Sequence, residues 1–192
     1  MLEIEKHDKE EVTISFLKAN LLGIFCGLLP VFVLGSIYYL VWGYSEINRT
    51  NSIKIISGSW GYLILLTIIA LGVVFHELIH GLTWARFATN GVKSVKYGIS
   101  WKFLTPYCHC AEPLQLKHYM TGAMMPSIVL GFIPSIIAIF LGDFNVLAFG
   151  LFFTLAAGGD FMVMNALRKE RNEILVQDHP TKIGYIVFRK NT

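Results

Sequence analysis

Four long stretches with few or no charges dominate the sequence. They cover residues 21–42, 61–82, 119–142 and 144–167, and a helix needs about 20 apolar residues to cross the hydrocarbon core of a bilayer. Only residues 142–144 separate the third stretch from the fourth, so these two are predicted to form a tight helical hairpin. The pattern therefore predicts four transmembrane helices and an all-α polytopic membrane protein.

A different periodicity appears in the loop at 92–113, between the second and third stretches. Apolar and polar side chains alternate there from residue 95 to residue 103, which is the period of a half-buried strand. Thr105 and Pro106 interrupt the alternation, and residues 107–111 can return as a partner strand. We therefore expect a small β-hairpin in this loop. A weaker signal of the same kind covers residues 183–188, within the tail at 168–192.

Composition supports a membrane protein and excludes several other classes. Of the 192 residues, 54% are apolar or aromatic and only 15% are Asp, Glu, Lys or Arg, against about 25% in a soluble domain. This balance excludes a soluble globular enzyme, a disordered chain and a coiled coil. The net charge of +3, without a basic run, excludes nucleic acid as the expected partner. We expect one domain over residues 1–192, embedded in the lipid bilayer.

The positions of Lys and Arg predict the orientation of this domain. Fourteen of the sixteen lie before the first stretch, between the second and third stretches, or in the tail. Only Arg49 and Lys54 lie between the first and second stretches. Because segments rich in Lys and Arg stay on the cytoplasmic side, we expect a multi-pass protein of the cell membrane. Both termini and the strand-forming loop are predicted to be cytoplasmic.

One motif carries specific chemistry, His76-Glu77-Leu78-Ile79-His80 in the second stretch. Two histidines four residues apart on a helix project from one face and can bind the same metal ion. Glu77 is placed to take a proton from water at that metal. The alternative is chance burial of three ionisable side chains. We favour the metal site, because such a pentapeptide arises by accident in about 1 in 100 sequences of this composition and ionisable groups inside a membrane are costly and usually functional.

A catalytic zinc site normally has three protein ligands and a water, so a third ligand is needed. The candidates are Asp143, Glu112, His118, His109 and Asp160. Asp143 is predicted to lie on the far side of the membrane, and Glu112 and His118 can be solvated in the loop. Asp160 is the only charged residue of the fourth stretch, at nearly the predicted depth of Leu78. We favour a ligand role for Asp160 over the alternative that its carboxylate is merely hydrogen-bonded to a neighbouring helix. His109, between two cysteines, is the other candidate for the third ligand.

Four segments of the sequence carry a resemblance to known proteins. They are His-Glu-Leu-Ile-His-Gly at 76–81, Tyr-Cys-His-Cys-Ala-Glu-Pro at 107–113, Gly-Gly-Asp at 158–160 and Asp-His-Pro-Thr-Lys-Ile-Gly at 178–184. With them the chain resembles a bacterial family of zincin-type membrane metallopeptidases of unknown function, related to the site-2 protease class of intramembrane metalloproteases. The resemblance implies a zinc-dependent peptidase in which His76, His80 and Asp160 bind the metal and Glu77 is the base.

The resemblance to site-2 proteases includes one departure. Those enzymes usually present their aspartate in an Asn-Pro-Asp-Gly setting, whereas this chain has Gly-Gly-Asp-Phe. Asn165, five residues after Asp160, and His109 are the candidates for stabilising the oxyanion or positioning the substrate. Similar hairpins flank the active site in site-2 protease relatives. The hairpin at 95–111 is therefore expected either to bind unwound substrate by β-addition or to rest on the membrane surface as a small amphipathic sheet.

Taken together, these features predict a membrane-embedded peptidase with Zn²⁺ as its cofactor. Its substrates would be membrane proteins or membrane-proximal peptides, hydrolysed by a water that the zinc activates and Glu77 deprotonates. Two alternatives keep the metal without hydrolysis: a catalytically inactive zinc-binding scaffold or regulator, and a metal transporter. Glu77 argues against the scaffold, because binding alone needs no base. The first and third stretches offer almost no polar residues to line a transport path.

Overall fold

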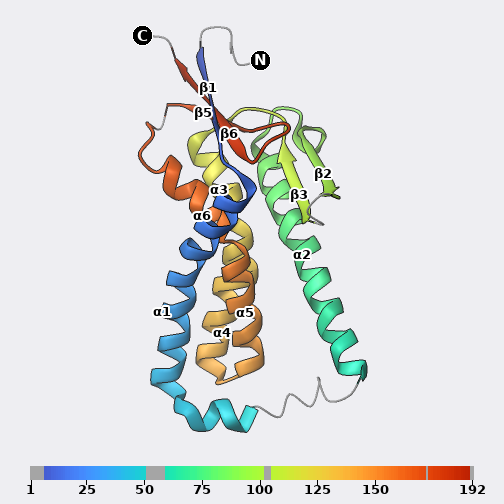
Figure 1. Ribbon diagram of the computed structural model, residues 1–192, viewed down its shortest axis with the longest axis vertical. Coiled ribbons are helices and arrows are strands. Elements are labelled where there is room, and N and C mark those ends of the chain that lie inside the picture. The colour runs from blue at the N-terminus through green and yellow to red at the C-terminus, as the bar shows by residue number, and fades with distance from the viewer. Residues whose placement is uncertain (1–6, 51–58, 102–104, 172, 191–192) are drawn as a thin grey trace.

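The computed structural model describes residues 7–50, 59–101, 105–171 and 173–190. Figure 1 shows a long, mostly helical molecule, with helices running along its long axis and strands gathered at one end. The first and last elements, β1 (His7–Thr13) and β6 (Gly184–Lys190), both lie at this end. We call the part formed by the strands the strand end. Lys54 and Phe103, which contributed to the sequence predictions, lie outside the described residues.

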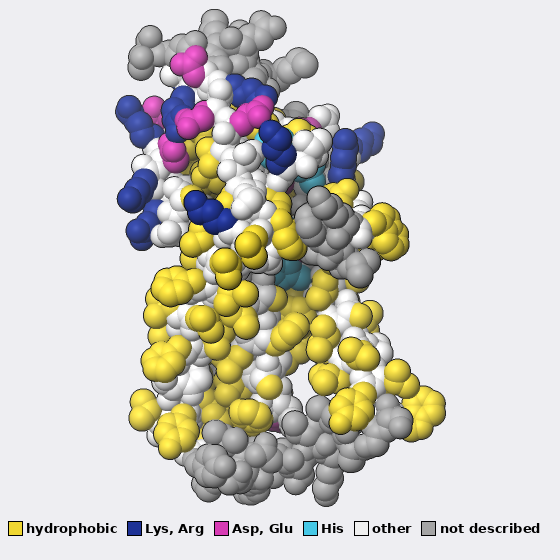
Figure 2. All heavy atoms as spheres, viewed as in Figure 1, with side chains coloured by type: hydrophobic (Ala, Val, Ile, Leu, Met, Phe, Trp, Pro, Cys, Tyr) yellow, Lys and Arg dark blue, Asp and Glu magenta, His cyan; other side chains and the backbone are white. Residues whose placement is uncertain are grey.

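Within the described chain, three segments are long and apolar enough to cross a membrane: Phe16–Gly43, Trp60–Phe87 and Leu116–Leu141. They belong to α1 (Phe16–Thr50), to α2 (Ser59–Phe87), and to the run of α3 (Leu116–Pro126), η4 (Ser127–Phe132) and α4 (Ile133–Leu141). α5 (Phe144–Ala156) and α6 (Gly158–Leu167) form a fourth span if the pair, bent by 46°, counts as one. Exposed apolar side chains cover this helical part (Figure 2), as expected of a multi-pass membrane protein.

Two of these spans differ from the regular helices that hydropathy predicts. The third contains a stretch of π-helix, η4, between Pro126 and Pro134, where neither proline can donate the backbone hydrogen bond of a regular helix. The fourth breaks at Ala157, whose φ and ψ of −74° and 6° are not helical. The continuous helix expected over 144–167 is therefore two helices, and the second of them begins at Gly158.

Glycines allow α1 to lie directly against the bent pair. A Cβ atom on Gly23 would lie 3.2 Å from the backbone nitrogen of Gly159, and one on Gly158 would lie 2.1 Å from the backbone oxygen of Gly23. Since real Cβ atoms do not approach other atoms to 2.1 Å, Gly158 cannot carry a side chain unless α1 moves. Such small-residue contacts let backbones approach closely in membranes. This contact fixes the position at which α6 begins.

Two antiparallel sheets make up the strand end. The short helix η3 (Gly91–Ser94) leads from α2 into β2 (Val95–Ser100), which pairs with β3 (Thr105–Cys110). This pair is the hairpin that the alternation predicts. The second sheet has the order β1-β6-β5-β4, with β5 (Leu175–Asp178) and β4 (Leu114–Gln115). Among the strands of this second sheet, only β6 coincides with a strand signal in the sequence. The expected fold class, all-α with one hairpin, was therefore incomplete, because it did not include this four-stranded sheet.

A hydrophobic core lies where α2, α3, α6 and the second sheet meet. Its buried residues include Trp84, Tyr119, Leu167, Val176 and Val187. Trp84 stacks on Tyr119 with ring centroids 5.5 Å apart, and its indole N–H donates a hydrogen bond to the backbone oxygen of Tyr119. This core therefore holds the end of α2 that carries the two histidines against α3.

Candidate metal centre

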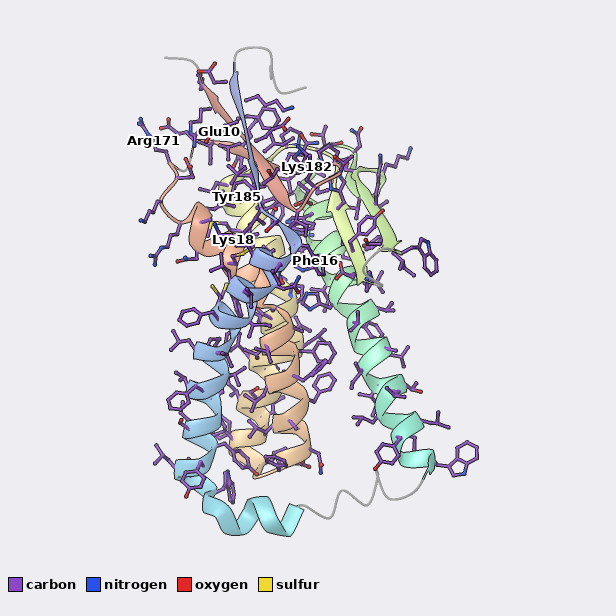
Figure 3. The ribbon with its side chains drawn as sticks, viewed as in Figure 1. Glu10, Phe16, Lys18, Arg171, Lys182 and Tyr185 are labelled. Carbon is purple, nitrogen blue, oxygen red and sulfur yellow. The ribbon has the colours of Figure 1, made fainter. Side chains whose placement is uncertain are left out.

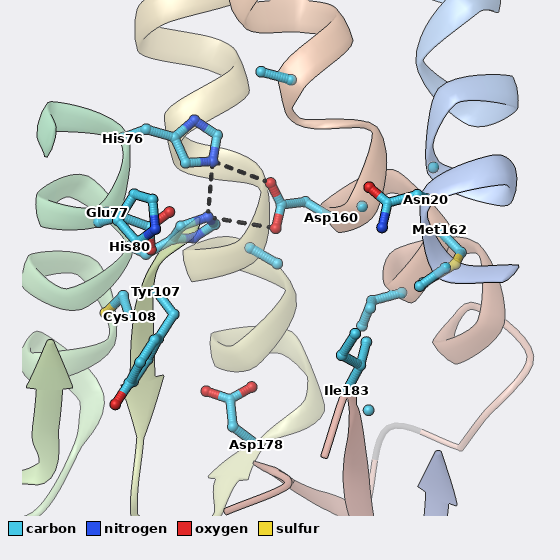
Figure 4. A pocket seen from close by; sticks show the side chains of 18 of the residues that line it. Asn20, His76, Glu77, His80, Tyr107, Cys108, Asp160, Met162, Asp178 and Ile183 are labelled. Carbon is cyan, nitrogen blue, oxygen red and sulfur yellow. Dashed lines mark hydrogen bonds and ion pairs between the residues drawn. The ribbon is translucent and has the colours of Figure 1, made fainter. Parts of the chain in front are cut away.

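The two histidines of the motif lie one turn apart on α2 and are buried, with 9% and 5% of His76 and His80 exposed. Their Nε2 atoms are 3.2 Å apart (Figure 4). Both rings therefore turn a nitrogen toward the same point. This is the arrangement that the four-residue spacing predicts for a shared metal ion.

Asp160, in the first turn of α6, completes a group of three side chains. Its Oδ2 atom lies 3.4 Å from His76 Nε2, and its Oδ1 atom lies 3.4 Å from His80 Nε2. Ligand atoms 2.0–2.1 Å from a tetrahedral zinc ion are about 3.3 Å from one another. The three separations therefore fit one zinc ion, and the donors, two imidazoles and a carboxylate, are of the kind that zinc binds.

The surroundings of His80 fix its orientation. Its Nδ1 atom lies 2.8 Å from the backbone oxygen of Gly122 in α3, so Nδ1–H is the donor and Nε2 keeps a lone pair for a metal. Trp84 stacks on the same ring with centroids 5.0 Å apart. A Cβ atom on Gly122 would lie 2.1 Å from the Trp84 indole, so the absence of a side chain there allows this packing. Neither Trp84 nor Gly122 was predicted to support the site, because only the tertiary structure brings them to His80.

The bend between α5 and α6 sets the position of Asp160. Because Gly158 contacts α1, we expect Gly158→Ala to displace α6 and to lower the free energy of unfolding by about 1–3 kcal/mol. Bound zinc should decrease as Asp160 moves away from the histidines. Thermal melts and metal analysis of the purified variant measure both effects.

The neighbouring glycine supplies the control for this prediction. A Cβ atom on Gly159 would have no atom within 4 Å, so Gly159→Ala should melt and bind zinc like the parent. If the two variants behave alike, close packing of α1 on Gly158 does not set the position of Asp160.

Glu77 lies beside the three ligands without belonging to their group. Its side chain is partly buried and lines the same cavity. Cys108, in β3, lines this cavity as well, and Figure 4 shows the two residues on the same side of it. The carboxylate is therefore next to the candidate metal position and is not needed as a ligand.

The other two predicted site residues lie apart from this group. His109 is on β3, where its Nδ1 atom is 3.9 Å from Oδ2 of Asp178. Asn165 is exposed on α6. Neither residue lines the cavity that contains His76, His80 and Asp160.

The remaining ligand candidates have structural contacts elsewhere. Asp143 caps the N-terminus of α5 by accepting hydrogen bonds from two backbone N–H groups. The ring of His118 stacks on Phe87. Glu112 accepts hydrogen bonds from Thr89, Asn90 and Ser94 at the start of the loop. Burial alone would raise the pKa of Glu112, but these hydrogen bonds hold it below its ordinary value.

The two cysteines that flank His109 are also explained without a metal. Burial raises the pKa of both thiols, that of Cys110 to about 11. Unless a metal ion binds them, both thiols are therefore protonated at neutral pH. The Cys110 thiol donates to the backbone oxygen of Glu112 at 3.6 Å.

The metal group forms part of the wall of a cavity of about 630 Å³. Much of the wall is apolar, and Asn20, Tyr119 and Asp178 add polar side chains from α1, α3 and β5. None of these three was predicted as a site residue. Asp178 lies in a segment that carries the family resemblance, but no local pattern places it near α2.

Comparison with known proteins identifies a family that the chain matches. A family model described as "Putative zincin peptidase" matches residues 68–175, which is more than half of the chain. The matched segment contains His76, Glu77, His80 and Asp160. No curated protein and no solved structure matches the chain.

Proposed function

Because the chain belongs to the "Putative zincin peptidase" family over residues 68–175, we propose that it is a membrane-embedded zinc peptidase. It would cleave peptide bonds of membrane or membrane-proximal substrates. One observation carries this proposal: His76, His80 and Asp160 bring three ligand atoms to the separations that a single zinc ion requires.

The proposed mechanism gives each side chain one role. His76, His80 and Asp160 hold the zinc, and Gly122 keeps His80 in the tautomer that binds through Nε2. These three residues would hold a zinc ion, whose contribution would be to polarise the peptide carbonyl and to lower the pKa of water. Glu77 accepts the proton of the attacking water and passes it to the leaving amine. Much of the cavity wall around these groups is apolar.

The surroundings of the site support a reaction at the membrane. The ligands come from α2 and from the bent pair, both apolar enough to cross a bilayer. Lys and Arg gather at the strand end (Figure 2), and Figure 3 labels Lys18, Arg171 and Lys182 there. Since positive charge marks the cytoplasmic side, we propose a protein of the cell membrane with its strand end in the cytoplasm. It would act as one domain and resemble the site-2 proteases in mechanism.

Metal content provides the direct test of this function. The parent protein, purified in detergent, is expected to hold about one zinc per chain and to cleave a peptide library until a chelator removes the metal. His76→Ala should lose most of the zinc and all of the cleavage. His118→Ala is the matched control, because His118 stacks on Phe87 outside the cavity. Zinc-free parent protein, or full zinc in the His76→Ala variant, contradicts the proposed site.

A further inference from the structure

A third carboxylate, that of Asp178, lies in the same cavity as Glu77 and Asp160. Tyr119 donates its hydroxyl to Oδ1 at 2.6 Å, and the backbone N–H of Cys110 donates to Oδ2 at 2.8 Å. These two bonds fix the side chain and use one lone pair of each oxygen, so each oxygen can accept one more hydrogen bond. Figure 4 shows the carboxylate pointing into the cavity, on the side toward the metal ligands.

Among the described residues, none gives the carboxylate of Asp178 a strong cationic partner. No Lys or Arg in the described part of the chain forms an ion pair with it, and its nearest basic group is His109 Nδ1, 3.9 Å away. Only 16% of the side chain is exposed, and burying a carboxylate without an opposite charge is costly. Burial accordingly raises the pKa of Asp178, because the hydrogen bonds from Tyr119 and Cys110 compensate for only part of the lost hydration. A cation entering the cavity would provide the missing charge.

The rest of the cavity wall indicates what would accompany that cation. Ile24, Phe152, Leu155, Met162 and Val163 line it with apolar side chains from α1, α5 and α6. Asp178 ends β5, at the strand end, where the chain's own Lys and Arg gather (Figures 1 and 2). A peptide that fills the cavity therefore meets apolar groups within the spans and a carboxylate at the strand end. Segments in which a transmembrane helix gives way to Lys or Arg on the cytoplasmic side have this pattern.

We propose that Asp178 determines specificity by receiving a Lys or Arg side chain of the substrate. The substrate class is then the juxtamembrane segment of a membrane protein, apolar on one side of the cleaved bond and basic on the strand-end side. This inference rests on the proposed peptidase function. It differs from a purely structural role for Asp178, in which its only task is to join β5 to Tyr119 and β3.

Pairs of peptides that differ only in charge test this proposal. Each synthetic peptide has an apolar stretch followed by a polar tail, in which arginine or its neutral isostere citrulline occupies one position at a time. The zinc-loaded full chain in detergent is expected to cleave the best arginine peptide with a kcat/KM at least about tenfold above that of its citrulline partner, as for close charge pairs in other interfaces. In Asp178→Asn this ratio should fall to about one, whatever the absolute rate.

Tyr119→Phe separates charge from structure. This variant removes one hydrogen bond to Asp178 and leaves the carboxylate, so the preference for arginine should persist even if the rate falls. If a thermal melt shows that Asp178→Asn is unfolded, Asp178→Ser replaces it as the neutral variant. The proposal is overturned if the parent does not distinguish arginine from citrulline, or if a folded neutral variant distinguishes them as well as the parent does.

A binding measurement separates failure of this inference from failure of the proposed function. Fluorescent arginine and citrulline peptides are titrated into Glu77→Gln, with and without Asp178→Asn, and anisotropy reports the affinity. If no peptide is cleaved by the parent but arginine peptides bind at least about tenfold more tightly only when Asp178 is present, the peptidase function fails and the cation subsite stands. If cleavage occurs without any preference in either measurement, the subsite alone is wrong.

Discussion

Replacing Glu77 by glutamine is expected to lower kcat/KM for peptide cleavage by about 10²- to 10⁴-fold, the range that a general base contributes. Glutamine keeps the size of the side chain but cannot accept the proton of the attacking water. Zinc content should stay at the parent value, because Glu77 lies outside the group of His76, His80 and Asp160. Cleavage of a peptide library, followed by mass spectrometry, and metal analysis of the same sample measure the two properties together.

Glu173→Gln is the matched control for this experiment. Glu173 is exposed and does not line the cavity, so its variant should cleave and bind zinc as the parent does. Equal cleavage by Glu77→Gln and the parent removes Glu77 from the mechanism. Loss of zinc in Glu77→Gln makes Glu77 a ligand or an essential support of one. A parent that binds zinc tightly and cleaves nothing favours the zinc-binding scaffold over the peptidase.

The parts of the fold that the sequence predicts are those that local patterns encode. Long apolar runs predict helices because backbone N–H and C=O groups inside a bilayer must form hydrogen bonds within the protein. The sequence predicts α1 and α2 in this way. The spacing of His76 and His80 needs only a regular helix to bring both rings to one face. Alternation from Val95 onward predicts β2 and β3 because successive side chains of a strand point to opposite faces. Counting residues along the second and fourth stretches predicted that Asp160 lies at nearly the depth of Leu78.

The parts that were not predicted depend on contacts between distant segments. β1 pairs with β6, His7 opposite Lys190, and no local pattern in the first thirteen residues specifies a partner at the other end of the chain. The break at Ala157 coincides with the packing of Gly158 on α1, so it is a tertiary feature inside a sequence that reads as one apolar helix. Asp178 reaches the cavity because β5 lies between β4 and β6. The segment that contains Asp178 could be recognised by its resemblance to the family, but a role for the Asp178 carboxylate in the cavity could not be predicted.

The choice between Asp160 and His109 as third ligand leads to the second large expected effect. Asp160→Asn keeps the shape of the side chain and removes its charge, so zinc affinity should fall by more than about 100-fold, the upper limit of what changes outside the ligand shell cost. Cleavage should be lost with the metal. His109→Ala should keep near-stoichiometric zinc, because His109 lies against Asp178 rather than in the ligand group. Any loss of activity in it would come from substrate positioning or oxyanion stabilisation.

The measurement is bound zinc per chain after purification in detergent, with titration by a competing chelator to give the affinity. A thermal melt of each variant, recorded without metal, excludes general misfolding, since Asp160 lies in the first turn of a helix that packs on α1. The ligand set must be redrawn if Asp160→Asn binds zinc as tightly as the parent while His109→Ala is metal-free. The metal would then lie at β3, at the strand end, and cleavage within the membrane would lose its main support.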